Sequence, residues 1–199
     1  MTDPSLLRIE PLAERHFPGL YQALDQVARE KRYLAFTQAP PFDEALAFYR
    51  GIVADGLCQC IAVLGGEVVG WCDVLPVRGE ARAHVGTLGI GLVPGARQRG
   101  IGAPLLKQAI AGAWARGMAR IELAVRADNL NAQALYRRFG FVQEACSATP
   151  TASMACTTTA WRWRCCGPDS RPAQPTGLQC ARPARSARPA PAHRPRGAS

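Results

Sequence analysis

The amino-acid sequence predicts a mixed α/β domain, with a mostly antiparallel central sheet flanked by helices. Its apolar residues switch repeatedly between the alternation typical of strands and the three-to-four spacing typical of helices. Three consecutive predicted strands are joined by short turns, which pair strands antiparallel. A strand–helix–strand unit follows them, which favours a right-handed parallel crossover. We therefore expect one domain, with a ligand site at mid-sheet where a helix N-terminus meets strand ends.

The first part of the chain is expected to form a strand and two helices. Residues 7–12 alternate apolar and polar side chains, as a strand does. Residues 13–30 carry apolar side chains at helical spacing, and Pro18 lies near the start, where proline is tolerated. Asp43 can cap a second helix, which Gly56 ends.

Three strands should follow. Residues 58–64 and 67–77 are apolar runs, and the Gly65-Gly66 pair between them is typical of a hairpin turn. After a polar loop, residues 83–93 form the predicted central strand. Short connections make these three strands antiparallel neighbours.

The last predicted elements are two helices and two strands. Residues 100–116 have a helical pattern that Gly117 ends. Residues 120–126 alternate cleanly, residues 131–139 form another helix, and a further strand begins at Phe141.

The turn between the central strand and its helix indicates an anion-binding site. It reads, from Gly89 to Leu106, G-I-G-L-V-P-G-A-R-Q-R-G-I-G-A-P-L-L. The first N–H groups of a helix lack internal partners and carry partial positive charge, and glycines let a backbone approach an anion. We therefore expect the turn to bind a diphosphate. The spacing does not match the dinucleotide motif G-x-G-x-x-G or the P-loop. A tight turn that binds no ligand is the alternative interpretation.

Two segments carry a resemblance to a known family. The order R-x-x-G-x-G from Arg97 to Gly102, preceded by a strand and Val-Pro, resembles the acyl-CoA-binding motif of the GNAT N-acetyltransferase superfamily. The segment N-L-N-A-Q-A-L-Y-R-R-F-G-F from Asn129 to Phe141 resembles that family's second motif, N-x-x-A-x-x-L-Y-x-x-x-G-F. Alone, the second segment could be an amphipathic core helix. Because the two motifs occur in order with the expected connections, the chain is identified as a member over about residues 7–144.

The resemblance implies an acyl-CoA N-acyltransferase-like fold and transfer of an acetyl group from acetyl-CoA to a primary amine. The amine, on a small molecule or a peptide, would attack directly in a ternary complex. A splay beside the central strand would admit the thioester, and backbone groups of Ile90 and Leu92 would hold the pantetheine and the acetyl carbonyl. No metal is implied. The cofactor-binding residues that the resemblance implies are Ile90, Leu92, Val93, Arg97, Gln98, Arg99, Gly100, Ile101, Gly102, Ala103, Asn129, Ala132 and Tyr136.

The catalytic candidates are an acid and a base. Tyr136 matches the residue that commonly protonates the departing thiolate, and a phenol with a pKa near ~10 can donate to a thiolate. An alkyl amine is mostly protonated at neutral pH, so a base must take its proton. Asp73 and His84 are the candidates, although Asp73 could only cap a turn and His84 could be an exposed loop residue. Trp71 lines the acceptor pocket or belongs to the core, and the acceptor itself is not identified.

Charge and cysteine usage exclude some classes of function. Most of the net charge of +9 lies after Glu144, where eight arginines stand against one acid, Asp169. We therefore expect no specific nucleic-acid partner, since a solvated tail explains the charge. Neither a signal peptide nor a membrane-spanning apolar run is recognisable, which favours a cytoplasmic protein with reduced thiols. Cys58 and Cys60 lack a metal-site spacing. The sequence is compatible with a homodimer as well as with a monomer.

The chain changes character after Glu144. We expect an acetyltransferase domain over residues 1–144, an altered last hairpin over 145–166 and a disordered Pro/Arg-rich tail over 167–199. One hypothesis is a natural low-complexity tail. The other is a frameshift, because reading back by one base can give G-L-F-S-D-A-Y-R-V-D-G-V-Y-D-D-C-L-A-M-A-L, a plausible family ending; sequencing the gene across codon 145 tests it.

The altered ending makes the final strand doubtful. Residues 157–165 still alternate, with two tryptophans on one face, and can replace the intended strand with arginines outward. Otherwise the sheet edge at Phe141 would be open. A CoA-binding but inactive protein is therefore the alternative function.

Overall fold

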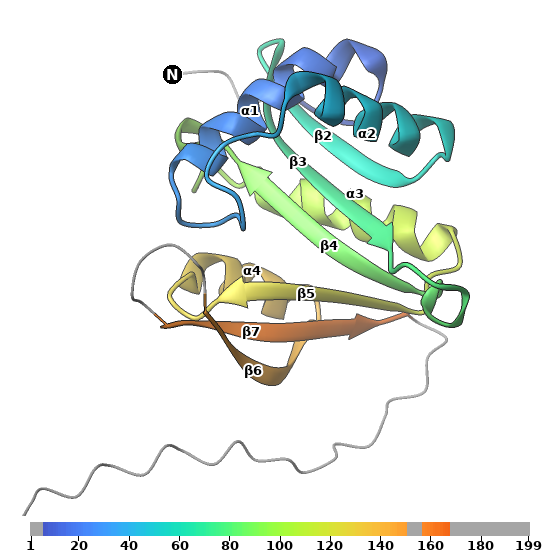
Figure 1. The fold of residues 1–199 in the computed structure, drawn as a ribbon, viewed down its shortest axis with the longest axis vertical. Helices are drawn as coiled ribbons and strands as arrows, with labels where there is room; N and C mark the ends of the chain where they lie inside the picture. Colours follow the sequence, from blue (N-terminus) through green and yellow to red (C-terminus); the bar gives the residue numbers. More distant parts are fainter. Residues whose placement is uncertain (1–5, 151–156, 168–199) are drawn as a thin grey trace, which may run out of the picture.

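The computed structural model describes residues 6–150 and 157–167, and Figure 1 shows one sheet with helices packed against it. Its strands are β1 (Leu7–Pro11), β2 (Cys58–Leu64), β3 (Glu67–Pro76), β4 (Val85–Leu92), β5 (Arg120–Arg126), β6 (Val142–Pro150) and β7 (Thr157–Cys166). Its helices are α1 (Phe17–Arg29), α2 (Phe42–Ala54), α3 (Gly102–Ala115) and α4 (Leu130–Arg138). The predicted elements are therefore present, with bounds that differ by a few residues.

Two helix starts differ from the prediction for local reasons. Residues 14–16 form a 3₁₀ turn, so that α1 begins at Phe17 with Pro18 in its first turn. Pro41 precedes α2, and Asp43 lies inside the first turn rather than at the cap. Asp43 therefore stabilises α2 through the positive end of the helix dipole, not by capping.

The sheet has seven strands in the order β1-β2-β3-β4-β5-β7-β6. Every neighbouring pair is antiparallel except β4 and β5, which α3 connects as a parallel crossover. This arrangement confirms the predicted mixed, mostly antiparallel sheet.

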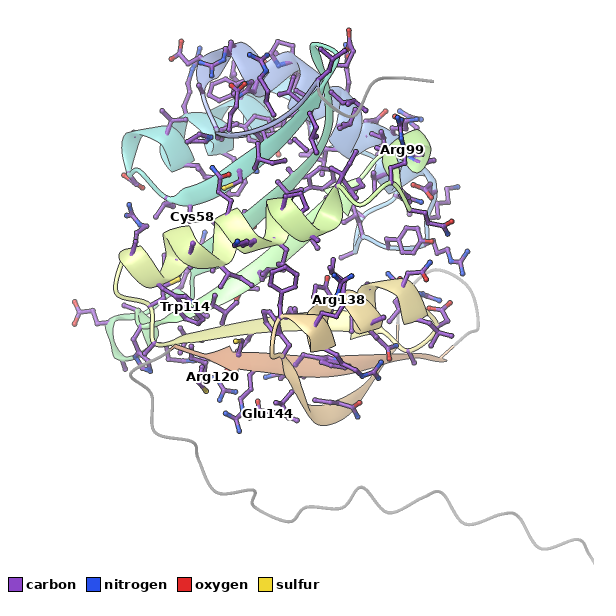
Figure 2. The ribbon with its side chains drawn as sticks, turned by 180° about the vertical axis from the view of Figure 1, so that it is seen from behind. Cys58, Arg99, Trp114, Arg120, Arg138 and Glu144 are labelled. Atoms are coloured by element: carbon purple, nitrogen blue, oxygen red, sulfur yellow. The ribbon has the colours of Figure 1, made fainter. Side chains whose placement is uncertain are left out.

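Helices cover both faces of the sheet. A core cluster on one face contains α3, Tyr136 of α4 and the Cys58 side of β2. The cluster on the opposite face contains α1, α2 and Ile61 of the same strand. Figure 2, seen from behind, shows α3 crossing the strands on the first of these faces. Because both faces of β2 are covered, all its residues are buried, which explains its unbroken apolar run.

The strand that the sequence left doubtful is formed by the altered ending itself. β7 lies between β5 and β6, paired with β5 from Arg120↔Cys166 to Arg126↔Ala160. Trp163 is only 1% exposed and lies beneath the guanidinium of Arg137, while Arg162 is exposed. The expectation that residues 157–165 form a strand is therefore confirmed, although Arg164 is half-buried in an ion pair with Glu144 rather than turned outward. The predicted tail lies outside the described residues from 168 onward, and the frameshift stays a hypothesis.

Candidate active site

The parallel pair in the middle of the sheet opens after three residues. Val85, Gly86 and Thr87 of β4 pair with residues 120–122 of β5, and the pairing stops there. Figure 1 shows the two strands diverging from this point toward the C-terminal end of β4. Among the described strands, the second half of β4 therefore has a neighbour on the β3 side only.

The alternation of hydrogen bonds along β4 shows which of its backbone groups face this opening. Val93 N donates to Val69 O at 3.0 Å, and Val77 N donates to Val85 O at 2.8 Å. In an antiparallel ladder the residues that bond to one neighbour alternate with residues that point away, and the β3–β4 register has no shift. The odd-numbered residues of β4 therefore bond to β3. Leu88, Ile90 and Leu92 turn their N–H and C=O groups toward the opening.

The turn after β4 offers free amide groups. Gln98 and Gly100 have φ of 58° and 79°, so the chain passes twice through the left-handed region. The bond of Leu105 N to Ile101 O, at 3.3 Å, starts the internal ladder of α3. The N–H groups of Gly102 and Ala103 precede it and lack a helical partner. Figure 2 shows Arg99 beside this end of α3. Backbone and charge therefore fit an anionic group.

Arg97, one of the expected cofactor-binding residues, is paired within the protein. Its Nη1 donates to Glu30 Oε2 at 2.7 Å, its Nε donates to Leu92 O at 2.9 Å, and its guanidinium lies 4.8 Å from the Tyr33 ring centroid. The Glu30 carboxylate raises the pKa of Arg97. The charge of Arg97 is therefore largely neutralised, and its side chain ties the turn to the segment after α1.

The segment of residues 30–38, here called the α1–α2 loop, contacts both sides of the opening. Glu30 binds Arg97, which follows β4 in the chain. Arg32 Nη2 lies 3.9 Å from Oδ2 of Asp128, which follows β5. The second pair is half exposed and contributes little stability. The geometry nevertheless places this loop across the end of the opening.

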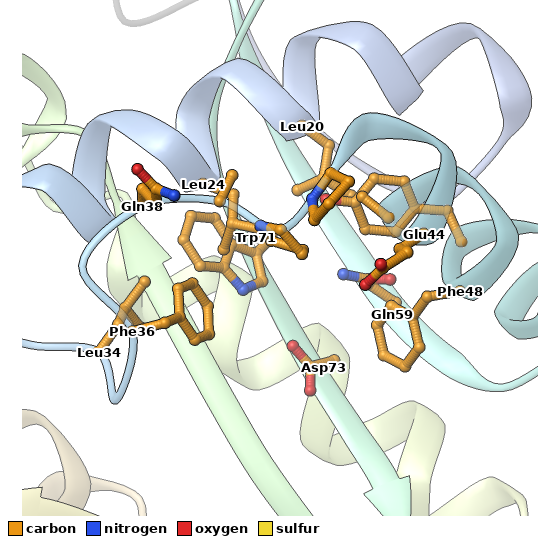
Figure 3. Close-up of a pocket in the computed structure, with 15 residues that line it drawn as sticks. Leu20, Leu24, Leu34, Phe36, Gln38, Glu44, Phe48, Gln59, Trp71 and Asp73 are labelled. Carbon is orange, nitrogen blue, oxygen red and sulfur yellow. The ribbon is translucent and has the colours of Figure 1, made fainter.

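On the α1/α2 face lies a pocket of about 630 Å³ (Figure 3). Its walls come from α1, the α1–α2 loop and α2, and its floor comes from β2 and β3. The lining residues are Leu20, Leu24, Leu34, Phe36, Gln38, Ala39, Pro40, Pro41, Glu44, Ala45, Phe48, Tyr49, Gln59, Trp71 and Asp73. This pocket is the candidate acceptor site.

Asp73 lies on the pocket floor next to the central strand. A Cβ added to Gly89 of β4 would lie 3.2 Å from both carboxylate oxygens of Asp73, so the carboxylate leans over this glycine. Burial raises the pKa of Asp73 to about 7, opposed only by its own backbone N–H. No ion pair among the described residues includes Asp73. A carboxylate with such a pKa can accept a proton near neutral pH.

Tyr136 lies on the opposite face of the sheet. It is 5% exposed, its ring centroid is 5.7 Å from that of Phe141, and Ile90 packs against the same core cluster. Burial raises the pKa of Tyr136, and Cys72, which pairs with Ile90 in the ladder, adds to the shift. The phenol therefore stays protonated at neutral pH beside β4. Asp73 and Tyr136 approach the same strand from opposite faces.

The structure does not bring His84 to this site. His84 is exposed before the start of β4, and its carbonyl accepts from Ala119 N at 2.9 Å. Gly89 lies five residue steps further along the chain, roughly 17 Å at about 3.4 Å per step. It does not line the pocket. The interpretation of His84 as an exposed loop residue fits this placement, and Asp73 is the remaining base candidate.

The remaining predicted site residues make contacts within the fold. Asn129 caps α4, because its Oδ1 accepts from Ala132 N at 3.2 Å. Ala132 and Val93 pack partly buried against the core. Trp71 lines the pocket and is also 5% exposed, so both interpretations of it hold.

Sequence reasoning missed two polar groups of the pocket, Tyr49 and Gln59. Gln59 is the polar residue within the apolar run of β2, which was an available signal. The position of Tyr49 on α2 resembles that of any core residue, and only the tertiary structure brings it to the pocket.

Comparison with known proteins decides the family. The model of the acetyltransferase (GNAT) family matches residues 21–141, more than half of the chain. The chain belongs to the GNAT acetyltransferase family. It is an acetyl-CoA-dependent acyltransferase. The L-amino acid N-acetyltransferase AaaT of Escherichia coli (strain K12) is 30% identical over 124 residues, which cover 61% of this chain and 76% of that protein.

Solved GNAT structures share the fold. A putative acetyltransferase from Salmonella typhimurium with its cofactor acetyl-CoA superposes with a TM-score of 0.77 at 14% identity, covering 86% of this chain and 99% of that one. A GNAT phosphinothricin acetyltransferase from Sinorhizobium meliloti, in complex with acetyl-CoA, gives 0.76 at 17% identity, with 85% and 94% covered. A ribosomal-protein-alanine N-acetyltransferase from Brucella melitensis gives 0.75 at 20%, with 80% and 99% covered.

Two further findings concern the described residues. None of their helices combines the length and apolar character needed to cross a membrane. Their His, Cys, Asp and Glu side chains form no group of three or more that could hold a metal ion.

Proposed function

We propose that this GNAT protein acetylates a primary amine by direct attack in a ternary complex, with Asp73 as base and Tyr136 as acid. The observation that carries the proposal is the opening beside β4. Unpaired backbone groups of Ile90 face it, Asp73 lies on one side of the sheet, and Tyr136 lies on the other. An amine and a thioester can therefore meet at β4 from opposite faces.

The residues around the opening fit acetyl-CoA, which supplies an activated acetyl group when bound. The amides of residues 98–103 would hold the diphosphate, because Gly102 and Ala103 start a helix and Arg99 adds charge. Backbone groups of Ile90 and Leu92 would hold the arm by adding strand-like hydrogen bonds. Val93, Ala132 and Asn129 would act as apolar or capping support around these groups.

The protein's own groups can manage both protons. The incoming ammonium loses one proton to the carboxylate of Asp73, whose pKa of about 7 leaves it partly ionised at neutral pH. The freed lone pair forms the new N–C bond while the C–S bond breaks, and the acylated nitrogen then loses its second proton to solvent. Tyr136 gives its proton to the thiolate and regains one from solvent, and Asp73 releases the proton that it took from the ammonium. Burial keeps Tyr136 protonated until that step.

Two alternatives deserve a direct comparison. One is a protein that binds acetyl-CoA without turnover, which the altered C-terminal strands motivate. The other is an amino-acid acceptor, which the name of the related L-amino acid N-acetyltransferase suggests. For the remaining organisation, we propose a cytoplasmic enzyme whose residues 168–199 take no part in catalysis.

The test combines binding and turnover. Calorimetry with acetyl-CoA and mass spectrometry of acetylated products from an amine panel would be run on the full chain, on D73N and on Y136F, with E67Q as an exposed control on the same strand as Asp73. We expect micromolar binding throughout and lost turnover in the two site variants. A folded protein without affinity for acetyl-CoA would refute the proposal. Equal turnover in wild type and Y136F would refute the role of Tyr136 as the acid.

A further inference from the structure

The pocket carries unsatisfied hydrogen-bond acceptors on its floor and on its α2 wall. Gln59 of β2 pairs directly with Asp73 of β3, so their side chains lie side by side on one face. Gln59 Oε1 and the Tyr49 hydroxyl are buried without a hydrogen-bond partner among the described residues. Gln59 is 5% and Tyr49 3% exposed, and both line the pocket with Asp73. Native proteins rarely leave such groups unpaired, which indicates that a ligand completes them.

These three groups match one chemical group. A primary ammonium has three N–H donors and no acceptor. A carboxylate, an amide oxygen and a phenolic oxygen can each accept one of them. Burial raises the pKa of Tyr49 to about 12, with contributions from Tyr21 and Asp73, so the hydroxyl stays neutral and its oxygen can accept.

The walls specify the rest of the molecule. The rest of the lining is mostly aromatic and aliphatic, with Trp71 on the floor and Phe36 and Phe48 on the walls, and Figure 3 shows them around Asp73 and Gln59. Phe36 and Phe48 are 42% and 54% exposed, large values for phenylalanines that a bound apolar group would cover. An aromatic wall also attracts a cation.

The pocket disfavours a substrate that carries a carboxylate. Its described lining holds two acids, Asp73 on the floor and Glu44 at the rim, and neither arginine nor lysine nor histidine. The nearby Arg97 is already paired with Glu30. A carboxylate next to the amine would lose its water without gaining a cation.

We propose that the acceptor is a primary alkylamine on an apolar, preferably aromatic, body without a carboxylate beside the amine. This inference rests on the proposed acetyl transfer and names its substrate class. The ammonium binds Asp73, Gln59 and Tyr49, and one of its protons passes to Asp73 before attack.

Three matched probes test the inference: 2-phenylethylamine, L-phenylalanine and L-phenylalanine methyl ester. They share the aromatic body, and the ester keeps the bulk of the carboxyl group without its charge. We expect kcat/KM for 2-phenylethylamine to exceed that for L-phenylalanine at least tenfold, with the ester closer to the amine. L-phenylalanine acetylated as well as 2-phenylethylamine would overturn the substrate class while leaving the proposed acetyl transfer intact.

Calorimetry of the same probes, without acetyl-CoA, gives a readout independent of turnover. The amine should bind more tightly than L-phenylalanine even if no product forms, in which case only the acetyl transfer fails. Q59L and Y49F should each weaken amine binding severalfold, whereas Q26L, an exposed glutamine of α1 outside the pocket, should leave it unchanged. Equal affinities for amine and amino acid, or unchanged binding in both floor variants, would overturn the inference.

Discussion

Replacing Asp73 by asparagine should stabilise the protein at alkaline pH while abolishing turnover. Burial raises the pKa of Asp73 from its ordinary 3.8 to about 7. The folded state therefore holds the proton more tightly than the unfolded chain does. The stability that this proton contributes is fully present below about pH 4 and is lost as the pH rises through 7. A shift of about 3 pKa units, at about 1.4 kcal/mol each, amounts to about 4 kcal/mol.

Asparagine is neutral at every pH, so D73N avoids this loss. We expect D73N to exceed wild type by up to about 4 kcal/mol in free energy of unfolding at pH 8.5, with a difference that shrinks steadily toward pH 4. Urea titrations followed by tryptophan fluorescence across this range would measure it, with E67Q as the exposed control. A pH-independent difference between D73N and wild type, or a less stable D73N at pH 8.5, would refute the burial of an ionisable Asp73.

The remaining predictions concern the acid, the central strand and the last strand. Y136F should lower kcat about 100-fold without changing the Kd for acetyl-CoA, and because burial raises the pKa of Tyr136, wild-type kcat should show no loss from phenol ionisation up to pH 9. Gly91→Ala should cost about 1–3 kcal/mol of stability, because its Cβ would overlap the indole packed on it; Gly95→Ala, whose Cβ meets open space, is its control. Trp163→Ala should cost about 3–5 kcal/mol in urea titrations, against less than about 0.5 kcal/mol for exposed Arg162→Ala.

Local pattern predicted the fold well because each element signals itself within a few residues. The alternation of residues 157–165 was sufficient to predict a strand even in an atypical ending, since periodicity does not depend on which apolar residues supply it. Asp43 was misplaced because a cap depends on one dihedral angle, and Pro41 had already fixed the helix start.

The site was harder, because register and long-range pairing decide it. Asp73 and His84 were both candidates until the β3–β4 ladder placed Asp73 opposite Gly89 and left His84 beyond the paired end. Nothing near Arg97 in the sequence indicates its partner, because Glu30 lies 67 residues earlier, at the start of the α1–α2 loop. The glycines and the helix start in the sequence predict the free amides of Gly102 and Ala103. The sequence does not predict that Glu30 neutralises Arg97.

The α1–α2 loop belongs to two binding regions at once. Its Glu30 and Tyr33 hold Arg97 at the proposed diphosphate turn, and its Leu34 and Phe36 form a wall of the acceptor pocket. If cofactor binding shifts the turn, the Arg97–Glu30 ion pair would pull on the loop that forms that wall. Thermodynamic linkage then requires reciprocity: if acetyl-CoA tightens the grip on the amine by some factor, the amine tightens the grip on acetyl-CoA by the same factor.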